Sequence, residues 1–376
     1  MQVRLERIAP SGEAVGRTPE GMVIFVPFAL PGEQIAVEVV HRRRSFARGR
    51  IIALLAPSPE RVRPQCPHFG VCGGCEWQHI AYAAQVRYKT AIVREQLERI
   101  GKLRQPLVRQ CIPCPLPYGY RNRIQLVADV GGRFGYRARG THQIVPITAC
   151  PIADATINRL LEARLPQQSV ARADLRAFDD GARLVAESEP VGWITVGPWR
   201  YRVSGDVFFQ VNTAMAWQLV QEVMRALAVQ PGDRVLELYC GVGLFTLPIA
   251  SAGARVLAVE VNPRAVADAQ HNLAAYGFSA ACVIAADAAD VLRAECARWD
   301  AVLVDPPRAG LERTAIAALL QLRARRVVYV SCEPSTLARD AHVLTSHGYR
   351  LNYAQPLDLF PQTHHVETVA YFELEA

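Results

Sequence analysis

A long, uncharged hydrophobic run is the feature that this sequence most plainly lacks. Although 51% of its 376 residues are hydrophobic, charged residues interrupt every apolar stretch before the roughly 18 residues that a membrane-spanning helix needs. The first residues, MQVRLERIAP, also lack the basic start, apolar run and small-residue cleavage site of a secretory signal. We therefore expect a soluble protein that works in the cytoplasm and has no membrane partner.

Internal repeats and low-complexity tracts are also absent, so the length must be explained by several folded units. A chain of 376 residues is too long for one ordinary hydrophobic core, and two or three domains are expected. Because disulfide bonds are rare in the cytoplasm, the ten cysteines are expected to be metal ligands, a nucleophile or small core residues. Their spacing must decide between these roles.

Acidic residues are scarce in the N-terminal half of the chain. The net charge is +7, with ten Arg and six Glu in residues 1–64 and thirteen Lys or Arg against four acids in residues 81–160. These two segments carry +4 and +9, which leaves −6 for the rest of the chain. A basic half joined to a mildly acidic half fits an RNA-holding module attached to a catalytic one. A solvated arginine-rich surface is the simpler alternative.

Short β-like pieces precede the proline-rich stretch at residues 56–67, separated by Ser-Gly, Pro-Glu-Gly and Pro-Gly turns. This pattern predicts a small antiparallel OB-like barrel, a fold that often binds nucleic acid. The expected strands are Val3–Ile8, Gly12–Arg17, Met22–Leu30, Gln34–Val40 and Gly49–Leu55. The residues suited to contact an RNA backbone, with one aromatic among basic side chains, are Arg42, Arg43, Arg44, Phe46, Arg48 and Arg50.

From about Val203 onward, β and α patterns alternate in the order typical of a parallel, doubly wound sheet. The fold class is therefore α/β, a Rossmann-like domain preceded by the barrel and by a mixed α+β central domain. The expected strands are Arg234–Tyr239, Arg255–Glu260, Ala301–Asp305 and Val327–Ser331. The expected helices are Leu244–Ser251, Pro263–Tyr276, Ala309–Gln321 and Pro334–Ser346.

The first of these strands leads into a turn that a nucleoside can approach closely. Gly241 and Gly243 lie between the strand and the next helix, and Glu260 ends the following strand, where a carboxylate binds ribose hydroxyls. No third glycine stands where a pyrophosphate is usually held, so S-adenosylmethionine fits better than a dinucleotide. Asp287 is placed to bind the adenine, with a plain surface-loop role as the alternative.

Three later residues carry reactive side chains. Asp305 begins the rigid turn DPPRAG, and Cys332 lies in YVSCEPSTLARD beside the start of a helix. A helix N-terminus lowers the pKa of a nearby thiol, so Cys332 is expected to ionise easily. Glu367 precedes the last apolar strand and offers a carboxylate for proton transfer. The neighbouring His364 and His365 diverge in direction and have no third ligand close by, so no metal is expected there.

The segments VLELYCGVGLF, DPPRAGL, YVSCEPSTLARD and FPQTHHVE together resemble the RNA 5-methyluridine methyltransferase family, over nearly the whole chain. The resemblance implies that Cys332 adds to C6 of a uridine, that C5 receives a methyl group from S-adenosylmethionine, and that Glu367 removes the C5 proton. The barrel is similar to a TRAM domain. Leu244 and Glu333 depart from the family, which has Asn at these places. The residues implied to contact cofactor or uridine are Gln210, Tyr239, Gly241, Glu260, Asp287 and Asp305.

The remaining cysteines suggest a metal site in two ways. Spacing alone favours a zinc ribbon made by Cys72, Cys75 and the later CIPC motif. A different set of cysteines resembles the iron–sulfur members of the family, which have C-x5-C-x2-C followed later by a single Cys before Pro. This resemblance implies a [4Fe-4S] cluster on Cys66, Cys72, Cys75 and Cys150.

Four segments follow from these patterns. Residues 1–60 are expected to form an RNA-binding TRAM-like barrel, 61–80 the cysteine segment, 81–202 a central RNA-binding domain, and 203–376 the methyltransferase domain. In the central domain, the residues suited to base stacking and phosphate contact are Tyr118, Tyr120, Arg121, Asn122, Arg123, Tyr136 and Arg137.

The expected reaction is methylation of one uridine in structured RNA, first in 23S rRNA, because a TRAM barrel with four cluster cysteines is similar to that branch of the family. A tRNA uridine is the alternative target. A 5-methylcytidine methyltransferase is disfavoured, since DPPR lacks the second cysteine that it would need. A non-catalytic iron–sulfur RNA-binding protein is disfavoured by the intact Cys332 and Glu367. No protein partner is implied, and a monomer is expected.

Overall fold

The N-terminal strands close into a small barrel, as the spacing of the turns predicted. The computed structural model describes residues 1–163, 171–185, 191–295 and 297–375. The barrel strands are β1 Gln2–Ile8, β2 Ala14–Arg17, β3 Val23–Val26, β4 Gln34–Arg42 and β5 Phe46–Ala56. They pair in the order β1-β2-β3-β5-β4, with alternate residues such as Leu5, Ile24 and Ile35 buried inside. The expectation of an antiparallel barrel is wrong at one pair, because β3 and β5 run parallel where the barrel closes.

The third barrel strand is much shorter than expected. The strand expected over Met22–Leu30 ends as β3 at Val26. Pro27 has no N–H group to donate to the sheet, and Phe28 has a φ of 61° that turns the chain out of the strand direction. Local turn chemistry therefore outweighed the apolar run.

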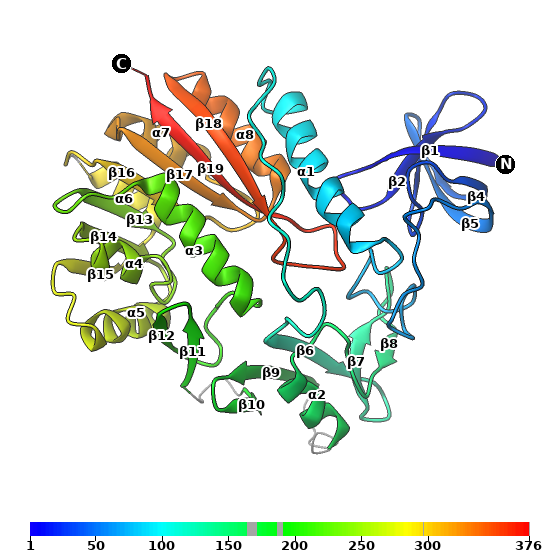
Figure 1. Cartoon of the computed structure of the whole chain (residues 1–376), viewed down its shortest axis with the longest axis horizontal. Coiled ribbons are helices and arrows are strands. Elements are labelled where there is room, and N and C mark those ends of the chain that lie inside the picture. The colour runs from blue at the N-terminus through cyan, green and yellow to red at the C-terminus, as the bar shows by residue number, and fades with distance from the viewer. Residues whose placement is uncertain (164–170, 186–190, 296, 376) are drawn as a thin grey trace.

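The C-terminal half forms one twisted sheet with helices on both faces, which is the α/β class predicted (Figure 1). The sheet strands are β13 Arg234–Leu238, β14 Arg255–Glu260, β15 Ala281–Ala285, β16 Ala301–Val304, β17 Arg326–Ser331, β18 Tyr349–Leu357 and β19 Glu367–Leu374. The order is β15-β14-β13-β16-β17-β19-β18, parallel as far as β17 and antiparallel at β19. The helices are α3 Thr213–Leu227, α4 Thr246–Ser251, α5 Pro263–Ala275, α6 Ala288–Ala294, α7 Arg313–Leu322 and α8 Pro334–Thr345.

Consecutive residues of these strands enter two different hydrophobic cores. Val235 and Leu303 pack in the cluster that contains α3 and α5, whereas Leu236 and Val302 pack in the cluster that contains α7 and α8. Because successive side chains of a strand point to opposite faces, the sheet is buried on both sides. The carboxyl ends of its parallel strands therefore meet at one edge, where loops are free to form a site.

A second, smaller sheet lies between the barrel and the large sheet. Its elements are β6 Arg123–Ala128, β7 Phe134–Arg137, β8 Ile144–Pro146, α2 Ala155–Glu162, β9 Arg172–Phe178 and β10 Gly181–Leu184, in the order β10-β9-β6-β7-β8. Ile124 and Leu175 bury one face of it with Ile157 of α2. A separate hairpin, β11 Gly192–Val196 and β12 Trp199–Val203, packs into the same core as α3.

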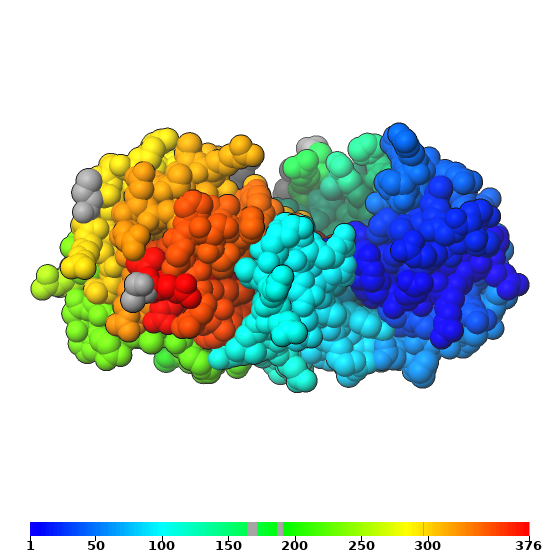
Figure 2. Space-filling model, turned by 90° about the horizontal axis from the view of Figure 1, so that it is seen from above, coloured from blue at the N-terminus to red at the C-terminus, as the bar shows by residue number. Residues whose placement is uncertain are grey.

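Helix α1, Tyr82–Arg99, crosses from the barrel to the large sheet (Figures 1 and 2). Although the sequence places α1 in the central segment, it packs on α8 and β18 of the large sheet, and its Ala84 and Ile92 enter the core of the barrel. Figure 2 shows the barrel and the large sheet at opposite ends, with α1 between them and a hollow between the orange and green segments. No helix in the described ranges is long and apolar enough to cross a membrane.

Candidate active site

The turn after β13 places three positive-φ residues beside the end of β14. Tyr239, Gly241 and Gly243 have φ values of 65°, 56° and 86°, and a Cβ added at Gly241 would meet no atom within 4 Å. Oε2 of Glu260 accepts a hydrogen bond of 3.0 Å from Gly241 N–H, and its Oε1 accepts one of 2.9 Å from Asn262 N–H. The carboxylate is thus held against an open glycine turn, as a ribose-binding group requires.

Asp287 lies at the next strand end and already has a structural role. Its Oδ1 accepts hydrogen bonds from the N–H groups of Ala289 (2.9 Å) and Asp290 (3.2 Å), so it is the N-cap of α6. The Tyr239 hydroxyl lies near this carboxyl, and burial and then Asp287 raise the tyrosine pKa.

Glu237 is a residue of this edge that the sequence reasoning missed. It is fully buried within β13, and neither carboxyl oxygen has a hydrogen-bond partner in the described part of the chain. Burial raises its pKa to about 8. An acidic residue in a strand of otherwise apolar residues, VLEL, was the available signal.

Strand register brings Asp305, Cys332 and Glu367 together. Asp305 follows β16, whose Val304 pairs with Tyr329 of β17, and Cys332 follows β17. The antiparallel β19 starts with Glu367 and pairs Thr368 with Ser331. All three side chains therefore lie at the carboxyl edge of the sheet, which is the arrangement that the sequence predicted.

The ionisation of these groups differs from the expectation. Burial, then Glu367 and Asp305, raises the pKa of the Cys332 thiol to about 12. Burial raises the pKa of Asp305 to about 7 and that of Glu367 well above its usual range. The prediction of an easily ionised thiol is wrong here, because burial and the acidic neighbours outweigh the helix end. Moreover, Glu333 already accepts a hydrogen bond from Ser335 N–H at that end.

Arg308 is a cation whose charge acts on Cys332 and Glu367, and it too was missed. It lowers the pKa of both Cys332 and Glu367, although burial dominates each shift. Its Nη2 lies 3.4 Å from Nε2 of His365, and burial and then His364 lower the pKa of His365 to about 3. A basic residue directly after DPP was the signal for it.

Gln210 is buried just before α3, in the segment FFQVN. Its carbonyl accepts a 3.0 Å hydrogen bond from the Asn122 side chain of the central sheet, which fixes the segment. Phe208 is 66% exposed two residues earlier. An exposed aromatic side chain beside a buried polar one suits the binding of a base, and Phe208 was not singled out from the sequence.

The four cysteines expected to bind a cluster line one cavity of about 110 Å³. Burial raises the pKa of Cys75 to about 12, and Cys150 and Cys72 add to the shift. In the described ranges, no group of three or more His, Cys, Asp or Glu side chains is arranged to hold a metal ion. All four thiols line the same cavity, so these residues fit a group that four thiolates hold together.

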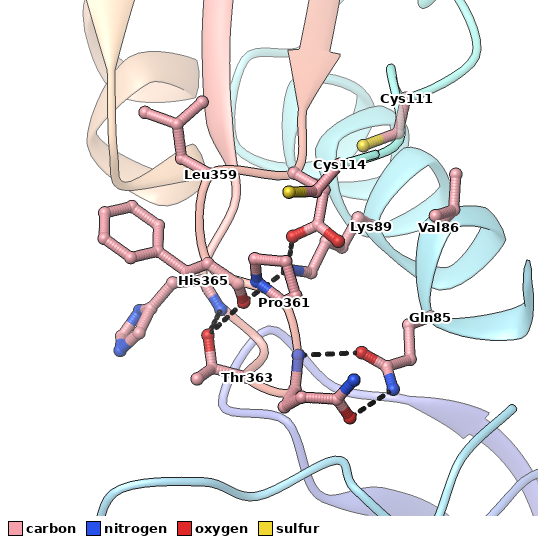
Figure 3. Close-up of polar contacts among 12 residues, drawn as sticks. Gln85, Val86, Lys89, Cys111, Cys114, Leu359, Pro361, Thr363 and His365 are labelled. Carbon is pink, nitrogen blue, oxygen red and sulfur yellow. Dashed lines mark hydrogen bonds and ion pairs between the residues drawn. The ribbon is translucent and has the colours of Figure 1, made fainter. Parts of the chain in front are cut away.

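The cysteines of the CIPC motif lie elsewhere. Cys111 and Cys114 are buried next to Lys89 and Asp358, and neither lines the cavity (Figure 3). The Cys114 sulfur accepts a 3.3 Å hydrogen bond from the Asn212 side chain. The zinc ribbon that spacing alone favoured is therefore not assembled.

Comparison with known proteins agrees with this geometry. The family described as tRNA (Uracil-5-)-methyltransferase matches residues 194–374, and the TRAM domain matches residues 1–52. The chain is 35% identical to the 23S rRNA (uracil(1939)-C(5))-methyltransferase of Nitrosococcus oceani, covering 98% of this chain and 95% of the relative. The corresponding enzyme of Acidithiobacillus ferrooxidans is 36% identical, covering 99% of this chain and 97% of that one.

The chain belongs to the RNA uracil-C5 methyltransferase family. Its fold is similar to the crystal structure of Pyrococcus abyssi tRNA (uracil-54, C5)-methyltransferase in complex with S-adenosyl-L-homocysteine, with a TM-score of 0.78, 25% identity and 99% coverage of both chains. The protein is thus an S-adenosylmethionine-dependent RNA (uracil-C5-)-methyltransferase with an N-terminal TRAM domain.

The two departures of this methyltransferase from its family have structural explanations. Leu244 is buried in the core around α3, and its carbonyl accepts a 2.9 Å hydrogen bond from Tyr201. It therefore contributes packing where an amide would offer polar contacts. Glu333 caps α8, which an asparagine would also do.

Proposed function

We propose that this protein methylates C5 of a specific uridine in structured RNA, most directly in 23S rRNA, with Cys332 as covalent nucleophile and Glu367 as base. One observation carries the proposal. The buried carboxyls of Glu237 and Glu367 and the half-buried carboxyl of Asp305 share one sheet edge with a cysteine, and all three pKa values are raised. Such an edge favours a cationic ligand, and S-adenosylmethionine carries both a sulfonium and an ammonium group.

The order of bond changes follows from the chemistry of uracil. Sγ of Cys332 bonds to C6, which makes C5 nucleophilic. S-adenosylmethionine, when bound, would supply the methyl group to C5 as its methyl–sulfur bond breaks, which would leave S-adenosylhomocysteine. Glu367 accepts the C5 proton, and the electrons of that C–H bond re-form the C5–C6 double bond as the C6–S bond breaks. The thiolate of Cys332 leaves, and the product is 5-methyluridine.

The remaining site residues are proposed to bind rather than react. Glu260 would accept hydrogen bonds from the ribose hydroxyls above the open turn at Gly241, and Asp287 would use its uncapped oxygen for the adenine. Tyr239 would pack against the nucleoside. Glu237 would pair with the ammonium group of the cofactor. Gln210 and Asp305 would contact the cofactor or the edge of the flipped uridine.

A [4Fe-4S] cluster on Cys66, Cys72, Cys75 and Cys150 is proposed as a second cofactor. The fit rests on the shared cavity and on four buried or half-buried thiols that a cluster would stabilise as thiolates. The cluster would order residues 61–80, since the methylation reaction transfers no electrons. Zinc is the alternative occupant.

The basic segments are proposed to hold the RNA, namely the barrel within residues 1–60 and the central region 81–202, against the catalytic region 203–376. Relatives at 35% and 36% identity are named for 23S rRNA, whereas the structure at 25% identity is named for tRNA. The ribosomal target is therefore favoured and tRNA is the second candidate. We also propose that the protein is a monomer and acts in the cytoplasm.

The test is methyl transfer from labelled S-adenosylmethionine to separate pools of 23S rRNA and tRNA, with nucleoside analysis of the product. We expect 5-methyluridine from the rRNA pool with the wild type and none with Cys332→Ala. Labelled 5-methyluridine in the tRNA pool alone would show that tRNA, and not 23S rRNA, is the substrate. Retained activity in Cys332→Ala would exclude the covalent mechanism.

A further inference from the structure

The loop that joins β18 to β19, residues 358–366, is the meeting point of several distant parts of the chain. It begins at the end of β18 and leads directly into Glu367. Its successive carbonyls are each bound by a different element. The acceptors and donors are Leu359 O with Asn212 Nδ2 (3.1 Å), Phe360 O with Lys89 Nζ (3.0 Å), Pro361 O with Tyr120 Oη (3.0 Å), and Gln362 O with the N–H groups of Glu76 (3.2 Å) and Trp77 (3.0 Å).

The first anchor is an ion pair without any exposure to solvent. Nζ of Lys89 lies 2.5 Å from Oδ1 of Asp358, and both side chains are 0% exposed. A buried ion pair adds little net stability, because the cost of desolvating two charges offsets their attraction. The same ammonium also binds the Phe360 carbonyl, so the pair fixes both the start of the loop and its third residue.

The second anchor is an exchange of hydrogen bonds between two glutamines. Oε1 of Gln85 accepts from Gln362 N–H at 3.0 Å, and Nε2 of Gln85 donates to Oε1 of Gln362 at 2.9 Å (Figure 3). Nε2 of Gln85 also donates to the carbonyls of Trp77 and Ile80, in the segment that follows Cys75. Gln362 has a φ of 70°, a conformation that a non-glycine residue keeps only when its surroundings hold it.

These anchors decide where β19 begins. Leu357, the last residue of β18, pairs with Glu367, so the loop closes at the position of the base. Figure 3 shows Gln85 and Lys89 extending from α1 to the loop from the same side. Helix α1 thus holds the loop by two side chains one turn apart.

We propose that Lys89 and Gln85 are positioning residues that set the carboxylate of Glu367 for removal of the C5 proton. The inference rests on the proposed function, because it uses the covalent route through Cys332. In that route, addition and methyl transfer precede proton removal. A misplaced Glu367 therefore slows the last step only, and the methylated RNA stays bonded to Cys332.

The experiment measures two quantities on 23S rRNA: methyl transfer in the first turnover, and the denaturant-stable adduct between protein and RNA. The variants are Gln85→Met and the paired Lys89→Met/Asp358→Asn, which removes both charges. The matched control is Leu97→Ala, two turns further along α1, where the side chain is buried in the core around α7 and α8. Glu367→Gln and Cys332→Ala calibrate the assay.

We expect each loop variant to keep first-turnover methylation close to that of the wild type. Steady-state turnover should fall on the order of 10- to 100-fold, which is the effect of a displacement of about 1 Å. Adduct should accumulate as it does in Glu367→Gln, and it should not do so in Leu97→Ala at equal folded fraction.

Two results separate the failures. In the first, Glu367→Gln accumulates adduct, neither loop variant does, and turnover falls only as far as the folded fraction falls. This result would overturn the positioning role and leave the proposed function intact. Methylation without adduct in any variant, including Glu367→Gln, would overturn the covalent route itself. The two loop variants remove different contacts, so one that fails to fold leaves the other to decide.

Discussion

Three carboxyl groups determine the charge at the sheet edge where the cofactor is proposed to bind. Glu237, Asp305 and Glu367 all have raised pKa values, with burial as the first cause. Each group therefore keeps its proton in the folded protein at pH values where it would lose it in the unfolded chain. Ionisation of these groups therefore lowers the free energy of unfolding, and a bound cation would offset that loss.

Glu237→Gln should therefore stabilise the protein at alkaline pH while weakening cofactor binding. The folded pKa of Glu237 is about 8 against 4.5 for the ordinary group, so its contribution to stability is full below about pH 4.5 and is lost as pH rises through 8. Glutamine stays neutral, and the variant should gain on the order of 4 kcal/mol relative to wild type above pH 8. Thermal unfolding without added cofactor, at pH 5 and pH 8.5, measures the difference, and calorimetric titration with S-adenosylhomocysteine measures the affinity. The prediction would be contradicted if the thermal stability of the two proteins changed equally between pH 5 and pH 8.5.

Arg308→Met should move the activity profile to higher pH. The guanidinium lowers the pKa of both Cys332 and Glu367, so its loss raises both, and the reactive anions then form only in more alkaline solution. The rising limb of kcat/KM against pH, measured from pH 6.5 to 9.5, should shift upward, with the largest loss of rate at neutral pH. Arg313→Met, at the start of α7, is the control and should leave the limb in place. A uniform loss at every pH would show a binding role instead.

At the scale of secondary-structure elements, helix α8 begins two residues after the nucleophile Cys332. Glu333 caps it by accepting from Ser335 N–H at 3.3 Å and from the Ser335 hydroxyl at 2.7 Å. Glu333→Ala should cost about 1 kcal/mol of stability, whereas Glu333→Asn keeps a capping side chain and should cost a few tenths. Chemical denaturation of the three proteins compares these values. Equal losses for Ala and Asn would mean that the cap contributes nothing.

The elements show what the sequence could and could not predict. Strands with apolar runs and the residues directly after them were readable, because parallel strands bring their carboxyl ends to one edge, and Asp305 and Cys332 were placed in this way. The pairing of Lys89 with Asp358 was not readable, since 269 residues separate them and no local pattern marks either one. In sequence, Gln85 and Lys89 look like the solvated face of a helix, yet both are fully buried.

In the whole molecule, charge and chemistry are separated along the long axis. The barrel lies at one end and the catalytic sheet at the other, with α1 between them (Figure 2). The exposed arginines Arg42, Arg43 and Arg44 lie at the tip of the β4–β5 hairpin, whereas Gly12 of the same barrel lies against His364 in the loop that precedes Glu367. These arginines belong to the barrel and the reacting groups belong to the large sheet, so the affinity for RNA and the chemical step should be separable by mutation.

Replacing Arg42, Arg43 and Arg44 together by Ala should weaken RNA binding without changing the chemical step. Their side chains are exposed on the barrel, and each phosphate contact that is lost reduces the slope of log Kd against log salt by about 0.7 to 0.9. Three contacts predict a slope reduced by about 2 to 3, with a raised KM and an unchanged kcat at saturating RNA. The matched control replaces three exposed arginines at the amino edge of the sheet, Arg323, Arg325 and Arg350, which removes the same charge. If both triple variants change the slope equally, the barrel acts only through net charge, whereas a change confined to the first locates the RNA on the TRAM domain.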